Sequence, residues 1–148
     1  MGQQQLLLIV LSVIIVGIAV VVGLTMFQTS AVDANRNAII GDLTNLAAKA
    51  QQFYKKPTSL GGGGQNFNGF TLSTAEQSND NGYYRITTAA VTTKQATVGA
   101  IPAYAAIGAS ATTIYVTAYG KEFGNDGTNF TMAYATVTGT TLATTIVN

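Results

Sequence analysis

Hydrophobic residues along the chain change their spacing twice. Residues 6–27 are apolar almost without interruption. The exceptions are Ser12, Gly17, Gly23 and Thr25. Between Ile39 and Tyr54 the apolar residues recur every three or four positions, which is the period of one helix face. From residue 68 onward, short runs of Thr, Ala, Tyr and Val alternate along the chain, as is typical of strands.

One long helix is predicted over residues 1–56. Pro57 ends it, because the residue before a proline avoids the α region. The apolar part, residues 1–28, contains a run that spans roughly 33 Å at ~1.5 Å per residue, enough to cross a hydrocarbon core of about 30 Å. The amphipathic part, residues 29–56, carries an apolar stripe with polar residues turned away from it. The stripe comprises Ile39, Ile40, Leu43, Leu46, Ala47, Ala50, Phe53 and Tyr54, and the outward residues are Asp42, Asn45, Lys49 and Gln52.

A Gly-rich connector, residues 57–67, and a sheet domain, residues 68–148, follow the helix. The four glycines Gly61–Gly64 predict a flexible break. Alternation and turn signals predict an antiparallel sheet. Strands are expected at residues 68–73, 82–91, 112–120, 129–139 and 140–148. Pro102 favours an edge strand or a loop over residues 96–111.

The sheet needs a partner to bury one of its faces. The second half of the helix offers the only substantial apolar stripe that remains, so we expect it to lie across the sheet. The predicted fold class is therefore α+β, with a long N-terminal helix on a small antiparallel head, in the shape of a ladle.

Composition removes several classes of function. A net charge of +1 with only 9% charged residues gives no basic surface for nucleic acid. The chain has no cysteine and no histidine, so thiolates and imidazoles are missing both as metal ligands and as catalytic groups. Asp80 and Asp126 stand in turn sequences, where such side chains bond to local backbone. We expect no enzyme activity, no cofactor and no metal site.

Asn129 begins an N-x-T sequon, Asn129-Phe130-Thr131. It is therefore a candidate glycosylation site. Phe130 within the same sequon is expected to be buried in a strand.

The apolar run could anchor one molecule in a bilayer, or it could be a surface on which copies pack. No basic residue precedes it, unlike a secretory signal. The amides of Gln3, Gln4 and Gln5 can satisfy free N–H groups of the first helical turn. Gly17 and Gly23 permit close approach between helices, or local loosening of one helix. A lone anchor needs neither feature.

In its order of elements the chain resembles the type IV pilin family. The resemblance rests on the N-terminal MGQQQLLLIVLSVIIVGIAVVVGLTMF and on AAKAQQFYKKPTSLGGGG, and so covers residues 1–64. It implies that a prepilin peptidase has removed a basic leader and that Met1 is N-methylated. Gln5 stands where the family typically has Glu, and its amide can still accept a hydrogen bond from a neighbour's amine. The family's proline near position 22 and its C-terminal cysteine pair are absent. If Met1 is the initiator, the processing point shifts to the neighbourhood of Gly2.

The resemblance implies a structural subunit of an extracellular, type IV pilus-like filament at the cell surface. Its partner is the same chain, with the inner membrane as a reservoir before assembly and a prepilin peptidase and pilus assembly machinery acting on it. The assembly residues would be Met1, Gln3, Gln4, Gln5, Leu6, Leu7, Gly17 and Gly23. Two alternatives are a membrane-anchored pseudopilin or minor pilin of a secretion or DNA-uptake system, and an archaeal-type pilin. A soluble enzyme is hard to reconcile with residues 6–27.

Overall fold

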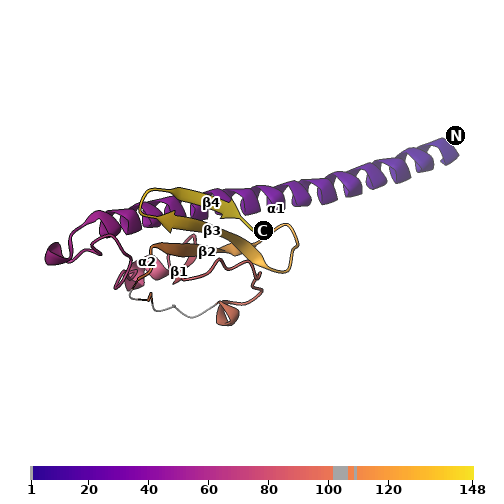
Figure 1. The fold of residues 1–148 in the computed structure, drawn as a ribbon. Helices are drawn as coiled ribbons and strands as arrows, with labels where there is room; N and C mark the ends of the chain where they lie inside the picture. Colours follow the sequence, from indigo (N-terminus) through magenta and orange to yellow (C-terminus); the bar gives the residue numbers. More distant parts are fainter. Residues whose placement is uncertain (1, 102–106, 109) are drawn as a thin grey trace. The chain divides into compact units, whose positions relative to one another are not determined.

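The computed structural model describes residues 2–101, 107–108 and 110–148. Within them, one long helix, α1 (Gly2–Lys55), packs on a four-stranded antiparallel sheet (Figure 1). The predicted α+β fold class is confirmed. The chain separates into two compact units, one ending at Ala31 and the other comprising Val32–Asn148. This division falls close to the point where the sequence changes from all-round apolar to amphipathic.

The sheet is a simple meander with strand order β1-β2-β3-β4 and antiparallel pairing throughout. Its strands are β1 (Gly82–Thr87), β2 (Thr113–Phe123), β3 (Phe130–Thr138) and β4 (Leu142–Ile146). β2 continues beyond the predicted end at residue 120, with a register shift between Tyr119 and Phe123. β1 ends at Thr87 rather than at residue 91. The Thr87 hydroxyl there donates to the carbonyl of Ala89 at 2.7 Å, a local side-chain bond of the kind that competes with strand pairing.

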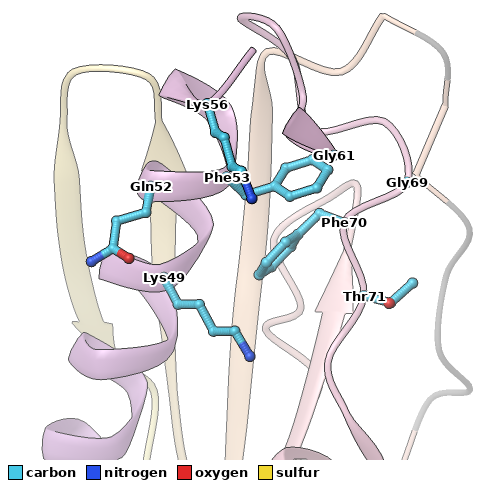
Figure 2. A pocket seen from close by; sticks show the side chains of 8 residues that line it. All are labelled: Lys49, Gln52, Phe53, Lys56, Gly61, Gly69, Phe70 and Thr71. Carbon is cyan, nitrogen blue, oxygen red and sulfur yellow. The ribbon is translucent and has the colours of Figure 1, made fainter. Parts of the chain in front are cut away.

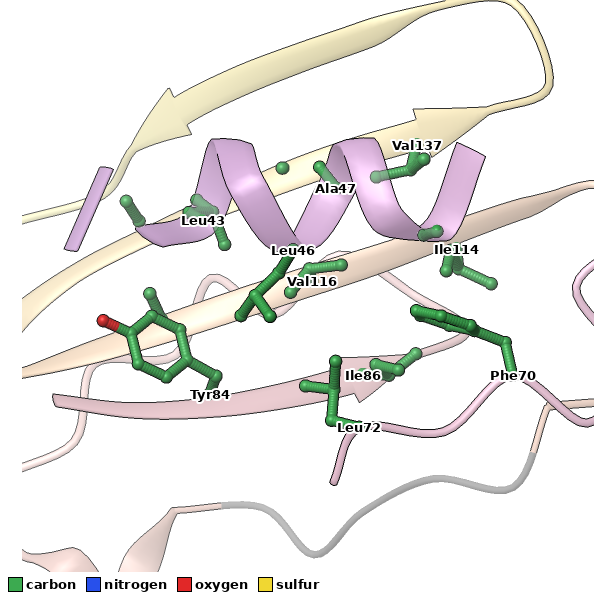
Figure 3. Close-up of a cluster of buried hydrophobic side chains, with 14 of the residues drawn as sticks. Leu43, Leu46, Ala47, Phe70, Leu72, Tyr84, Ile86, Ile114, Val116 and Val137 are labelled. Carbon is green, nitrogen blue, oxygen red and sulfur yellow. The ribbon is translucent and has the colours of Figure 1, made fainter. Parts of the chain in front are cut away.

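The hydrophobic core lies between the second half of α1 and one face of the sheet (Figure 3). The helix contributes the stripe expected from its spacing, with Ile39, Leu43 and Ala47 fully buried. Ile40, Phe53 and Tyr54 pack at its margin. The sheet contributes every second residue of its strands, as the alternation of strand side chains requires. These sheet residues are Tyr84, Ile86, Ile114, Val116, Ala118, Ala133, Ala135 and Val137.

Residues 68–73 do not form the predicted strand. Turn chemistry prevails over strand propensity here. Asn66 Oδ1 accepts the Asn68 N–H at 2.9 Å, and Gly69 adopts a φ of 77°, in the region that favours glycine. The following Ser73 and Glu76 form a capping box that starts the short helix α2 (Thr74–Gln77). The apolar residues of this segment still enter the core, as Phe70 and Leu72 do.

The segment 96–111 was expected to be an edge strand or a loop. Its described residues form no strand, and Val98–Ala100 form a 3-10 turn, η2. Pro102 and its neighbours up to residue 106 lie outside the described residues, as does residue 109.

The glycine tract caps the C-terminal end of α1 with backbone hydrogen bonds. Gly63 N–H donates to the Phe53 carbonyl at 2.8 Å, and Gly64 N–H donates to the Lys56 carbonyl at 3.0 Å. These bonds satisfy carbonyls that a helix end leaves without partners. A side chain at Gly63 would place its Cβ against the Asn66 carbonyl oxygen, so the tight path itself requires glycine.

Asp42 faces the head instead of turning away as expected. Its Oδ2 accepts hydrogen bonds from Asn79 Nδ2 (2.9 Å), Asn81 Nδ2 (2.8 Å) and Tyr84 Oη (2.6 Å). Partial burial acts to raise the pKa of Asp42, but donation by Asn81, Tyr84 and Asn79 outweighs it and holds the pKa below 3.8. One carboxylate therefore ties α1 to β1 and to the turn that precedes it.

Replacing Leu43 by Ala should lower the free energy of unfolding by about 2–5 kcal/mol, because it opens a cavity beneath a fully buried side chain. Chemical denaturation of the full chain in detergent, followed by near-UV circular dichroism, measures this loss. The matched control is Leu11→Ala, at a residue that is 48% exposed, and it should leave the midpoint unchanged. Equal effects of the two variants would contradict the assigned core.

Asp42→Asn should reduce the loss of folding stability that acidification causes. The folded-state pKa of Asp42 lies below the unfolded value, so its bonds stabilise the fold above pH ~3.8 and are lost as pH falls through the folded value. Wild type should therefore lose more stability than Asp42→Asn on acidification, while being the more stable of the two at pH 7. Thermal melts from pH 7 to 2 measure the difference. Asp80→Asn, at an exposed position of the same turn, is the control, and parallel curves for wild type and Asp42→Asn would refute the role.

Candidate assembly surface

Residues 6–27 of α1 present apolar side chains on every side of the helix. Their large hydrophobic residues are between 48% (Leu11) and 78% (Phe27) exposed, and none is buried by the described chain. Soluble monomers rarely expose a contiguous apolar patch of more than a few hundred Å². This stretch is therefore the strongest candidate for a functional surface.

The polar groups within this surface are bonded inside the helix itself. Ser12 Oγ donates to the carbonyl of Ile9 at 2.7 Å, and Thr25 Oγ1 donates to that of Val22 at 2.8 Å. A hydroxyl that bonds to the preceding turn needs no water. The helix can therefore enter a water-free environment without leaving these donors unpaired.

The glycines make two gaps in this otherwise bulky surface. A Cβ built at Gly17 or at Gly23 would meet no heavy atom within 4 Å. The chain's own packing therefore does not require glycine at either position. Close approach of another helix would, because a small residue lets two backbones come together.

The other expected assembly residues lie on the first turns. Gln3, Gln4 and Gln5 are exposed, and Leu6 and Leu7 are 65% and 68% exposed. Met1, the residue expected to be methylated, lies outside the described residues. Of the described helices, α1 alone is long and apolar enough to cross a membrane.

A shallow hollow of about 280 Å³ lies beside the C-terminal end of α1 (Figure 2). Its floor is aromatic, with the rings of Phe53 and Phe70 tilted against each other at a centroid distance of 5.3 Å. Lys49 and Lys56 stand at its margin, and the Lys49 ammonium is paired with Glu76. This bond from Lys49 lowers the pKa of Glu76, and Ser73 adds to the effect. The lining residues include no acid, imidazole or thiol.

The sequon at Asn129 is engaged by the fold. Asn129 Nδ2 donates to Asp126 Oδ2 at 2.9 Å, and the backbone and side-chain amides of Asn129 hold the pKa of Asp126 far below its usual range. Thr131, the third sequon residue, is fully buried and donates to Asn35 Oδ1 at 2.8 Å. The fold thus holds Asn129 in a side-chain hydrogen bond and buries the threonine of the sequon.

Asp126 bonds to the local backbone, as its turn context predicts. Its Oδ1 accepts the N–H groups of Thr128 and Asn129. In the turn before β1 that role belongs to Asn79, whose Oδ1 accepts from the backbone of Asn81 and Gly82, and not to Asp80. Among the described residues, no group of three His, Cys, Asp or Glu side chains could hold a metal ion.

The sequence did not predict the hydrogen bonds that Asp42 accepts from Asn79, Asn81 and Tyr84. A signal was present, because Asp42 directly precedes the buried Leu43 and two asparagines flank the predicted turn at Asp80. Only the fold shows that these amides, which lie 37 and 39 residues away in the chain, reach that carboxylate.

No family model, curated protein or solved structure matches the chain.

Proposed function

We propose that the chain is the structural subunit of an extracellular, type IV pilus-like filament, and that it polymerises through its N-terminal helix. The observation that carries the proposal is the all-round exposure of the apolar residues 6–27. Val32–Asn148 forms a separate compact unit with a core of its own, so these apolar side chains remain available to other molecules.

The chemistry of this helix suits both of the environments that the proposal requires, a lipid bilayer and a bundle of sister helices. Lipid tails accept it because its hydroxyls are bonded internally and its first ionisable side chain is Asp33. A bundle of sister helices accepts it because Gly17 and Gly23 allow close backbone approach, which supplies van der Waals contacts that replace those to lipid. The inner membrane is then the reservoir and the filament is the product.

Membrane anchoring without polymerisation is the rival function, as in a pseudopilin or a minor pilin. It is favoured by one observation, the length of the apolar helix, which suits a bilayer span. Electron cryomicroscopy of material sheared from cells separates the two. A helical polymer with the N-terminal helices at its axis supports the filament. A chain that stays wholly in the membrane fraction refutes it.

Gly17→Leu and Gly23→Leu should impair polymerisation and leave membrane insertion intact. Each substitution increases hydropathy but fills a gap where another helix would approach. Shed filament should fall by about tenfold or more, equivalent to ~1.4 kcal/mol or more per subunit. Immunoblots of the sheared and membrane fractions measure both quantities.

Val16→Leu is the matched control, since it changes an already bulky, exposed neighbour. Its filament yield should equal that of wild type. Undiminished filaments from both glycine variants would exclude the proposed close packing.

A further inference from the structure

The two edges of the sheet differ in their protection. At β1, Ser78 bridges to Tyr83, and Arg85 Nη1 donates to the Gln77 carbonyl at 3.0 Å, so residues 77–78 cover that edge. No described strand lies beyond β4, and residues 143–146 are exposed. Edge strands are commonly protected by charges or proline, yet residues 139–148 contain neither.

The hydrogen bonds of β4 fix which backbone groups face outward. Thr138 N–H donates to the Thr141 carbonyl at 3.0 Å, and Val147 N–H donates to the Met132 carbonyl at 2.8 Å. Antiparallel pairs alternate between bonded and non-bonded, so residues 143 and 145 also face β3. The N–H and C=O groups of Leu142, Thr144 and Ile146 therefore point away from the sheet.

The outward-facing residues of β4 can pair with the same residues of a second β4 that runs antiparallel to it. If two copies of β4 run antiparallel about a two-fold axis at Thr144, Thr144 faces Thr144 and Leu142 faces Ile146 twice. All the outward groups then pair, giving about six backbone hydrogen bonds. Thr–Thr and aliphatic cross-strand pairs are favourable, and no like charges meet. The pairing also covers Ile146, which is 53% exposed.

We propose that β4 pairs with β4 of a second copy of this chain, in the antiparallel register centred on Thr144. The contact is an isologous interface that joins two sheets into one. An interface between two five-residue strands buries less than the ~1,200 Å² that is typical of a stable complex, so two isolated subunits should bind each other weakly. Rows of subunits in two filaments would form many such contacts at once, and their combined affinity would be higher.

The next inference rests on the proposed filament. Within that proposal, the symmetry of the β4 contact determines which subunits it can join. The two-fold axis of this contact is perpendicular to the joined sheet, so the two subunits that it relates point in opposite directions. Subunits within one helical filament all point in the same direction. The β4 contact therefore joins neighbouring filaments that run antiparallel, and it bundles them sideways.

Cysteine cross-linking of the full chain in detergent tests the register, because the chain has no cysteine of its own. In Thr144→Cys the two Cα atoms would lie about 5.5 Å apart, within disulfide range. In the equally exposed Ala143→Cys they would lie diagonally at roughly 7–8 Å, outside it. We expect dimer from Thr144→Cys under mild oxidation, at least tenfold faster than from Ala143→Cys. Equal rates, or no dimer from either, overturn the pairing.

Lysine substitutions test the consequence in filaments. Thr144→Lys sets two ammonium groups opposite each other at the axis, whereas Ala143→Lys faces Thr145. Thr144→Lys filaments should remain single in electron micrographs, and wild-type and Ala143→Lys filaments should bundle. Filaments that form but bundle equally in all three overturn the lateral role and leave the proposed function standing. If no variant forms filaments, the proposed function fails, and the cross-linking result alone decides the β4 contact.

Discussion

The exposure of the apolar side chains of residues 6–27 is the physical constraint from which the proposed function follows. Burying one large aliphatic side chain is worth ~1.5–3 kcal/mol, and this surface carries such side chains around the whole helix. The described chain buries none of them. Lipid and other helices are the two environments that could supply this burial, and the proposed function depends on which of them is present.

The head, which comprises the second half of α1 and the sheet, buries its core without using residues 6–27. The core closes between the stripe of α1 and one face of the sheet, with Leu43, Ile86 and Val116 fully buried. Asp42 adds a polar tie from α1 to β1, and the amides after Gly62 satisfy carbonyls at the end of the helix. The core and these hydrogen bonds lie within Val32–Asn148, so the contacts that hold this unit together involve none of the side chains of residues 6–27.

The sequence predicted features that depend on residue spacing and failed where distant residues meet. The helical stripe and the alternation within β2 and β3 could be read directly, because burial imposes those periods locally. Residues 68–73 were misjudged because Asn66 and Gly69 favour a turn more strongly than Phe70 and Leu72 favour a strand. The Asp42 network and the exposed edge at β4 depend on which strands lie at the ends of the sheet. Spacing along one chain does not determine strand order.

The hydroxyls of Ser12 and Thr25 have a thermodynamic consequence. Because each is bonded to a carbonyl of its own helix, both donors keep their partners when the helix changes its surroundings. In the proposed transfer from bilayer to filament, the apolar helix therefore exchanges hydrocarbon contacts without breaking these two hydrogen bonds. The proposed move out of the membrane therefore carries no desolvation cost from these two hydroxyls.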